Sequence, residues 1–183
     1  MIRRPPRSTQ GVSSAASDVY KRQEPVEKLE VHKRGLKHKA ISIFVFCGSK
    51  LLIQQRASNK YHSPELWANS CCSHPNWGES SEDCSSRRIF EELGLKNLEL
   101  RFIDQIEYKA NVGSELIEHE VVDCFSAFCE TTPEIKMNPE EVKDFAWVDI
   151  EKLRENVKNS PAKYTQWFKI YLNEHFEKLF IFQ

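Results

Sequence analysis

The chain has 183 residues, of which 40% are hydrophobic and 29% are charged, as is usual for one globular domain with one core. Its 26 basic and 27 acidic side chains nearly cancel, so no overall positive field favours nucleic-acid binding. No apolar run approaches the roughly 18 residues that would suggest a membrane span, and no apolar stretch marks a secretory signal. Six cysteines in such a chain favour free thiols in the cytoplasm over a disulfide framework.

The first 23 residues differ in composition from the remainder. They are rich in Arg, Ser and Pro, carry one acidic side chain, and have no period of apolar residues. Such a segment is typical of a disordered tail or a transit-peptide-like leader. The string also resembles translated sequencing-adapter sequence, and we favour this third interpretation, in which the native N-terminus and a first strand are missing. We therefore expect a disordered, non-native leader over 1–23 and a single domain over 24–183.

The first part of that domain is predicted to be a β-hairpin followed by a loop. Residues 40–46 are an apolar run typical of a buried strand, Gly48-Ser49-Lys50 predicts the turn, and residues 51–55 predict the returning strand. Residues 57–78 contain two prolines and a glycine and are predicted to form a long functional loop.

Helices and strands are predicted to mix in the rest of the chain. A helix is expected over 81–93, because Gly94 is favourable just past a helix end. Strands are expected near 99–108, 119–129 and 143–148. A short helix capped by Asp149 and a helical segment over 161–181 should follow. This mixture indicates an α+β fold, with a mixed β-sheet flanked by helices.

The predicted helix over 81–93 carries adjacent carboxylates, Glu91 and Glu92, which point about 100° apart on a helix. Arg87 and Arg88 each precede one of them by four residues, so an ordinary solvated helix with ion pairs is one interpretation. The other interpretation comes from a longer pattern, G-x5-E-x7-R-E-U-x-E-E-x-G-U, where U is apolar. Its matching positions are Glu79, Arg87, Ile89, Glu91, Glu92, Gly94 and Leu95. The pattern resembles the Nudix box, with Ser73 in place of its first glycine and Arg88 in place of a glutamate.

Imidazoles and carboxylates are also placed as candidate metal ligands. Glu118 and Glu120 should share one face of their strand, because strand side chains alternate with period two. Together with His32, His38 and His74 they suit a divalent ion such as Mn²⁺ or Zn²⁺. A single histidine of this kind would ordinarily be a surface residue.

Two adjacent thiols, Cys71 and Cys72, precede His74 in the segment Asn69-Ser70-Cys71-Cys72-Ser73-His74-Pro75. They could be buried structural cysteines or half of a zinc ribbon. A ribbon needs a second C-x2-C pair, whereas Cys124 and Cys129 are separated by four residues within a predicted strand.

These motifs together resemble the type 1 isopentenyl-diphosphate isomerases, a branch of the Nudix superfamily, over about residues 26–170. The resemblance implies an α/β/α sandwich-like Nudix fold and isomerisation of isopentenyl diphosphate to dimethylallyl diphosphate in isoprenoid precursor synthesis. It implies that Cys72 and Glu120 carry the protons. It also implies Mg²⁺ held by Glu92 and the backbone carbonyl of Cys72. The implied Mn²⁺ or Zn²⁺ ligands are His32, His38, His74, Glu118 and Glu120. His32 and His38 are one residue closer in sequence than their counterparts in a bacterial member.

Further roles follow from the same resemblance. Tyr108 would support the proton carriers, and Trp167 would stabilise a carbocation through its ring face, with Trp67 as a further wall. Taken alone, Trp167 would be a core aromatic. The diphosphate would be bound by cations that would otherwise be surface charges: Lys28, Arg56, Lys60 and Arg88.

The expected function is therefore that of an isomerase, and the expected partner is isopentenyl diphosphate, with neither nucleic acid nor membrane. We expect a monomer or a weak homodimer. The alternative function is a Nudix hydrolase of a nucleoside or other diphosphate, which Arg88 disfavours because it replaces a metal-binding glutamate. A non-catalytic metal-binding module is the third possibility.

Overall fold

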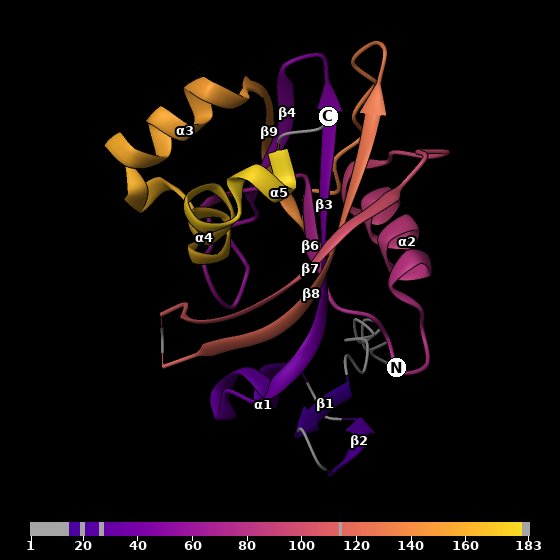
Figure 1. Ribbon diagram of the computed structural model, residues 1–183, viewed down its shortest axis with the longest axis vertical. Helices are drawn as coiled ribbons and strands as arrows, with labels where there is room; N and C mark the ends of the chain where they lie inside the picture. The colour runs from indigo at the N-terminus through magenta and orange to yellow at the C-terminus, as the bar shows by residue number, and fades with distance from the viewer. Residues whose placement is uncertain (1–14, 19–20, 26–27, 114, 181–183) are drawn as a thin grey trace, which may run out of the picture.

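The computed structural model describes residues 15–18, 21–25, 28–113 and 115–180, which form a mixed β-sheet between two layers of helices (Figure 1). The elements are β1 (Ala15–Asp18), β2 (Lys21–Pro25), α1 (Lys28–Arg34), β3 (Lys37–Cys47), β4 (Lys50–Arg56), β5 (Trp67–Ala68), β6 (Cys71–Ser73), α2 (Ser81–Leu93), β7 (Arg101–Asn111), β8 (Ile117–Cys129), β9 (Val142–Asp149), α3 (Ile150–Asn159), the 3₁₀ turn η1 (Pro161–Lys163), α4 (Gln166–Glu174) and α5 (Phe176–Phe180).

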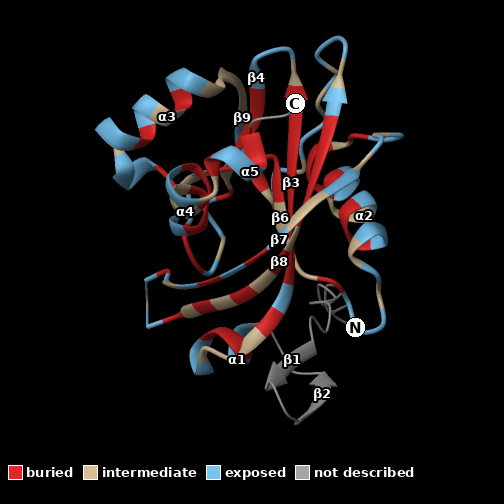
Figure 2. Ribbon diagram, in the orientation of Figure 1, coloured by how far each residue is buried: buried red, intermediate tan, exposed pale blue. Residues whose placement is uncertain are grey.

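Strand β3 organises the sheet. It runs parallel to β8 along its whole length, and on its other edge it pairs antiparallel with β4 and β6. Strand β7 continues the sheet beyond β8, and β9 continues it beyond β4. Both faces of β3 are buried (Figure 2), as expected for a strand covered by helices on both sides.

Helices cover the two faces of the sheet unequally. Helix α2 packs on one face, over Ile41, Ile43 and Val45 of β3. Helices α3, α4 and α5 pack on the other face, where Phe44 and Phe46 are buried. The predicted α+β fold with a mixed sheet between helices is therefore confirmed. Among the described residues, no helix combines the length and apolar character needed to cross a bilayer.

The segment predicted as one long loop, 57–78, contains two short strands. β5 pairs with β4, and β6 pairs with β3 through Ile41↔Ser73 and Ile43↔Cys71. Three residues give too weak a periodic signal to predict a strand, and here the pairing with β3 decides the structure. The thiol-bearing segment is therefore fixed to the central strand.

The helical segment expected over 161–181 is divided into η1, α4 and α5. Tyr164 and Thr165 are extended between η1 and α4, because Tyr164 bridges Trp67 and the Thr165 amide donates to the Trp67 carbonyl at 3.0 Å. Helix α4 then ends at Glu174, and the amide of the following residue, His175, donates to the Tyr171 carbonyl. Residue 181 lies outside the described part of the chain.

Three N-terminal elements, α1, β1 and β2, had no signal in the sequence. α1 is a seven-residue helix that brings His32 to the sheet. β1 and β2 pair with each other, and Ala16 of β1 pairs with His38 of β3. These strands fall partly within the segment expected to be a leader, and residues 1–14 and 19–20 of that segment lie outside the described residues. Whether the segment is native stays a prediction.

Gly94 ends α2 and leads to a stability prediction. Its φ of 70° is left-handed, and its amide donates to the Phe90 carbonyl at 2.8 Å. A Cβ at this position would lie 2.7 Å from the Cβ of Lys136. We expect Gly94→Ala to lower the free energy of unfolding by about 2–3 kcal/mol, from strain and the clash together. Urea unfolding measures this loss.

Gly48 provides the matched control for that experiment. It is also left-handed, with φ of 57°, but a Cβ there would meet no atom within 4 Å. Gly48→Ala should therefore show the backbone strain alone, about 1–2 kcal/mol. Equal losses in the two variants would contradict the clash at Lys136.

Candidate functional site

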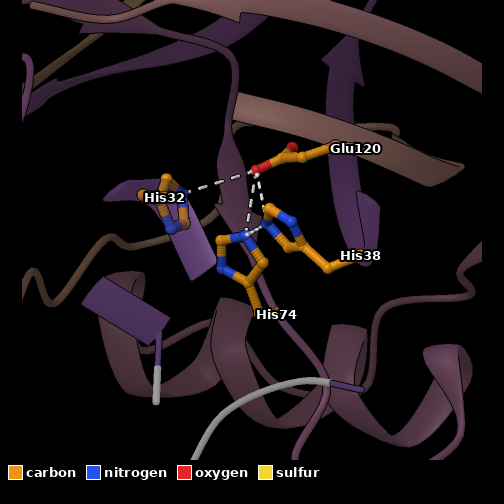
Figure 3. Close-up of side chains that lie close together, drawn as sticks. All are labelled: His32, His38, His74 and Glu120. Carbon is orange, nitrogen blue, oxygen red and sulfur yellow. Dashed lines mark hydrogen bonds and ion pairs between the residues drawn. The ribbon is translucent and has the colours of Figure 1, made fainter. Parts of the chain in front are cut away.

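Three imidazoles, those of His32, His38 and His74, lie around one carboxylate oxygen of Glu120 (Figure 3). Glu120 Oε1 lies 2.9 Å from His74 Nε2, 3.5 Å from His38 Nε2 and 4.0 Å from His32 Nε2. The four residues come from α1, β3, the segment after β6, and β8. Their potential ligand atoms all lie within 4.8 Å of one another. Nitrogen and oxygen donors so close together suit a divalent cation.

The sheet positions this cluster. His38 and Glu120 are direct partners in the parallel β3–β8 pair, so their side chains share a face. The Leu36 carbonyl lies 2.8 Å from His38 Nδ1. A carbonyl only accepts, so Nδ1 carries the proton and donates to it, while Nε2 faces the cluster. His32 joins the group through α1, despite its short spacing to His38.

Glu120 is held ionised inside this buried cluster. Burial acts to raise its pKa, but the imidazoles of His74 and His38 outweigh that effect and hold the pKa of Glu120 well below its usual range. The Tyr108 hydroxyl lies 2.8 Å from Glu120 Oε2 and 2.9 Å from Glu118 Oε2. The prediction that Glu118 and Glu120 share one strand face is confirmed by these two contacts.

Glu118 lies beside a different imidazole from those around Glu120. Its Oε1 is 3.7 Å from Nε2 of His62, and its close ligand atoms form a group with His32 and His62. His62, which lies in the loop between β4 and β5, is not among the site residues predicted from the sequence. The sequence signal for His62 is its place within residues 57–78, the segment predicted to be a functional loop.

The two adjacent cysteines point to opposite sides of β6. Cys71 is fully buried in the core beneath α2, whereas Cys72 lines the pocket that also contains His74 and Glu120. Alternation along a strand explains the difference. Of the two thiols, only Cys72 is therefore placed to meet a substrate in this pocket.

A chain of hydrogen bonds orients the Cys72 thiol. Asn69 Nδ2 donates to the carbonyls of Ile43 and Cys71, which leaves Asn69 Oδ1 to accept from Cys72 Sγ at 2.9 Å. Because the thiol has one proton, the hydroxyl of Ser42 donates to the sulfur at 3.1 Å. Burial raises the pKa of Cys72 to about 12, so the thiol stays protonated near neutral pH.

This protonated thiol leads to a prediction about alkylation. Iodoacetamide reacts with the thiolate, so modification of Cys72 should keep rising with pH from 7 to 10, without a plateau near 9. The unfolded chain should level off above the ordinary thiol pKa of about 8.5. Quenched labelling followed by mass spectrometry of the Cys72 peptide measures both rates. A plateau below pH 9 in the folded protein would contradict a raised pKa.

Cations and carboxylates form a network on the α2 side of the pocket. Arg88 donates to Glu92 Oε1 at 2.6 Å, and Gln54 donates to Glu92 Oε2 at 2.9 Å. Arg88 also lies 3.3 Å from Glu141, which pairs with Lys60. These contacts hold the pKa of Glu141 below its usual range, although burial opposes the shift. Arg88 and Lys60 thus bring two positive charges to the pocket.

Of the other residues predicted for the site, two line the same pocket and two do not belong to its described lining. The guanidinium of Arg56 lies 5.2 Å from the ring centroid of Trp167, and both residues line the pocket. Trp67 is not among the residues that line the pocket: it pairs with Gln55 and is half-buried against the core that contains residues of α3, α4 and α5. The side chain of Lys28 lies outside the described part of the structure.

One pocket therefore collects most of the predicted site. The predicted residues that line it are Arg56, Lys60, Cys72, His74, Arg88, Glu92, Tyr108, Glu118, Glu120 and Trp167. It combines a neutral thiol, buried carboxylates, cations and an aromatic wall. Such a pocket can hold an anionic group at one end and transfer protons at the other.

Comparison with known proteins agrees with this architecture. Residues 36–168 match the NUDIX domain model. A protein from Deinococcus radiodurans aligns with a TM-score of 0.61 and 17% identity, covering 73% of this chain and 80% of that one. A MutT NUDIX hydrolase from Burkholderia pseudomallei aligns with a TM-score of 0.59 and 16% identity, covering 75% and 97%. At these identities the structures support the fold alone.

Sequence relatives are much closer. The isopentenyl-diphosphate Delta-isomerase of Cereibacter sphaeroides is 54% identical over 156 residues, covering 85% of this chain and 88% of the relative. The enzyme of the same name from Rhodobacter capsulatus is 50% identical, covering 86% and 89%. The chain belongs to the Nudix family and, within it, to the isopentenyl-diphosphate Delta-isomerases.

Proposed function

We propose that this protein converts isopentenyl diphosphate to dimethylallyl diphosphate, with Cys72 and Glu120 as the two proton carriers. One proton is added to the terminal alkene carbon, which creates a tertiary carbocation, and another is removed from the neighbouring methylene. The observation that carries the proposal is the pairing, in one pocket, of a protonated thiol with a carboxylate held ionised by imidazoles. General acid–base catalysis requires both kinds of group near the substrate.

The other pocket residues fit the remaining needs of this reaction. The indole face of Trp167 can stabilise a cation, by about 2 kcal/mol or more once water is excluded. Arg56, Lys60 and Arg88 would bind the diphosphate, since guanidinium groups pair bidentately with phosphate. Tyr108 would orient both Glu118 and Glu120 through its hydroxyl contacts.

Two kinds of divalent ion fit the donors present. We propose Mn²⁺ or Zn²⁺ at His32, His38, His74, Glu118 and Glu120, since three imidazoles and carboxylate oxygens match their preferences. We propose Mg²⁺ at Glu92 and the Cys72 carbonyl, completed by substrate phosphate oxygens. The bound ions would supply positive charge that stabilises the diphosphate and alters the proton affinity of Glu120.

Proton NMR in D₂O tests the proposed reaction. The purified protein is incubated with isopentenyl diphosphate, Mg²⁺ and Mn²⁺. Dimethylallyl diphosphate carrying deuterium is the expected product. Orthophosphate or a monophosphate, detected by ³¹P NMR, would instead assign the protein to the hydrolases of the Nudix superfamily and overturn the proposal.

We further propose a cytoplasmic monomer or weak homodimer whose first 23 residues are dispensable. Six free cysteines fit a reducing compartment.

Deleting residues 1–23 should leave the isomerase rate within about twofold, because every proposed site residue lies after this segment. The NMR assay of the truncated chain measures the rate. A large loss of activity in a folded truncated protein would contradict dispensability.

A further inference from the structure

Two thiols outside the pocket, Cys47 and Cys129, lie side by side at one end of the central sheet. Cys47 is the last residue of β3 and Cys129 is the last residue of β8, and the two are direct partners in the parallel pairing of these strands. The C-terminal ends of both strands lie at the end of the sheet away from α1 (Figure 1). The proposed reaction uses neither thiol.

The pairing places both side chains on the same face of the sheet. Cys129 packs against the core beneath α2, to which Val45 of β3 also belongs. Because strand side chains alternate, Cys47 points to the same side as Val45. On the opposite face the preceding partners, Phe46 and Phe128, show the same register, since their rings stack with centroids 5.3 Å apart and planes 17° apart. The two cysteine side chains are therefore neighbours.

The two sulfur atoms are placed within reach of a bond. Neighbouring strands lie about 4.8 Å apart, and a disulfide joins Cα atoms about 4.4–6.8 Å apart. Cys47 Sγ lies 3.9 Å from the carbonyl oxygen of Glu130, the residue after Cys129, so it leans toward β8. Both cysteines end their strands, so the turn at Gly48 and the segment after Cys129 can absorb the small approach that a disulfide requires.

Both thiols are accessible from solvent. Cys47, Cys72 and Cys129 are partly exposed, whereas the other three cysteines are buried. Cys72 lines the pocket and pairs with Ser42, five residues before Cys47, which places it about 16 Å away along β3. Burial and the neighbouring Cys47 thiol raise the pKa of Cys129, so the two groups interact. Of the partly exposed thiols, only these two can therefore react with each other.

We propose that Cys47 and Cys129 are an oxidation site that reacts with a peroxide and closes to a disulfide within the chain. One thiolate attacks the O–O bond of hydrogen peroxide and becomes a sulfenic acid, and water leaves. The other thiol attacks that sulfur, the S–S bond forms, and a second water leaves. The two thiols lose two electrons and two protons in total, and the peroxide is reduced to water. A thiol reductant reverses the reaction.

The disulfide fastens the central strand pair far from the proposed site. Cys47 follows His38 by nine residues on β3, and Cys129 follows Glu120 by nine residues on β8, which corresponds to about 30 Å. The bond also closes the whole segment between β3 and β8 into one loop, which restricts the unfolded chain. We expect the melting temperature of the oxidised protein to rise by about 5–15 °C.

Peptide mapping tests this proposal. The full chain is treated with hydrogen peroxide, the remaining thiols are blocked with iodoacetamide, and the protein is digested without reductant. We expect a pair of peptides joined through Cys47 and Cys129, released by dithiothreitol, from a protein that stays monomeric on a non-reducing gel. Melting temperatures are compared in the Cys72→Ala variant, so that oxidation of the pocket thiol cannot contribute to the shift.

Single substitutions of the pair provide the decisive comparison. Cys47→Ser and Cys129→Ser should each lose the joined peptides and the rise in melting temperature. Cys71→Ala, at a buried thiol beneath α2, is the matched control and should keep both. Circular dichroism checks the fold of each variant. A disulfide between two molecules, thiols that stay reduced or become sulfinic acids without joining, or a rise that persists in Cys47→Ser would overturn the proposal. None of these readouts depends on the isomerase activity.

Discussion

Replacing Cys72 with alanine is expected to lower the isomerase rate by about 10³-fold or more, since a positioned acid or base contributes about 10²–10⁴-fold. The variant loses the one thiol that lines the pocket, while the partners that orient it, Asn69 and Ser42, remain. Deuterium incorporation followed by proton NMR measures the loss. Cys72→Ser should also be slow, because a hydroxyl is a much weaker acid than a thiol.

Cys71→Ala is the matched control for this experiment. Its thiol is the direct neighbour of Cys72, but it is buried beneath α2 rather than in the pocket. We expect a lower melting temperature and an isomerase rate within about twofold of the wild type. If Cys71→Ala lost as much activity as Cys72→Ala at equal folded fraction, the assignment of the catalytic thiol would be wrong.

Replacing Glu120 with glutamine is expected to remove both activity and most of the metal affinity. Glutamine keeps the size of the side chain but loses its charge and its capacity to carry a proton. The isomerase rate should fall by about 10³-fold or more. Mn²⁺ affinity should fall at least about 10–100-fold, the loss found when even an indirect partner of a metal site is removed. NMR measures the first effect, and electron paramagnetic resonance of free Mn²⁺ measures the second.

Glu107→Gln separates these effects from a general change in charge. Glu107 is an exposed carboxylate on β7 that pairs with Lys37 and His119. Its replacement should change neither rate nor metal affinity. Retention of activity in Glu120→Gln would exclude Glu120 as a proton carrier. Loss of activity with unchanged Mn²⁺ affinity would separate proton transfer from metal binding.

Local patterns predicted the parts of the fold that depend on neighbouring residues. The turn at Gly48, the end of α2 at Gly94 and the cap of α3 at Asp149 each have a residue with a specific conformational or hydrogen-bonding preference. Period-two alternation also placed Glu118 and Glu120 on one face. In each case the sequence signal and the structural cause lie within a few residues.

The features that the sequence did not predict depend on distant partners. α1 has seven residues, too few for a stable isolated helix, and it forms beside the sheet. Trp67 was expected as a wall of the pocket, but it pairs with Gln55 and is not among the residues that line the pocket. His62 belongs to a loop whose shape depends on hydrogen bonds from Arg56. None of these contacts produces a periodic pattern of apolar residues in the sequence.

The parallel pairing of β3 and β8 has a consequence for how the protein folds. Parallel neighbours cannot be joined by a tight turn, so β4, β5, β6, α2 and β7 all intervene along the chain before β8. His38 and Glu120 become partners only when the two ends of this intervening chain come together. Pairings between segments so far apart in sequence form slowly. Capture of a cation should therefore report the completion of the central sheet during refolding, later than the hairpin of β3 and β4.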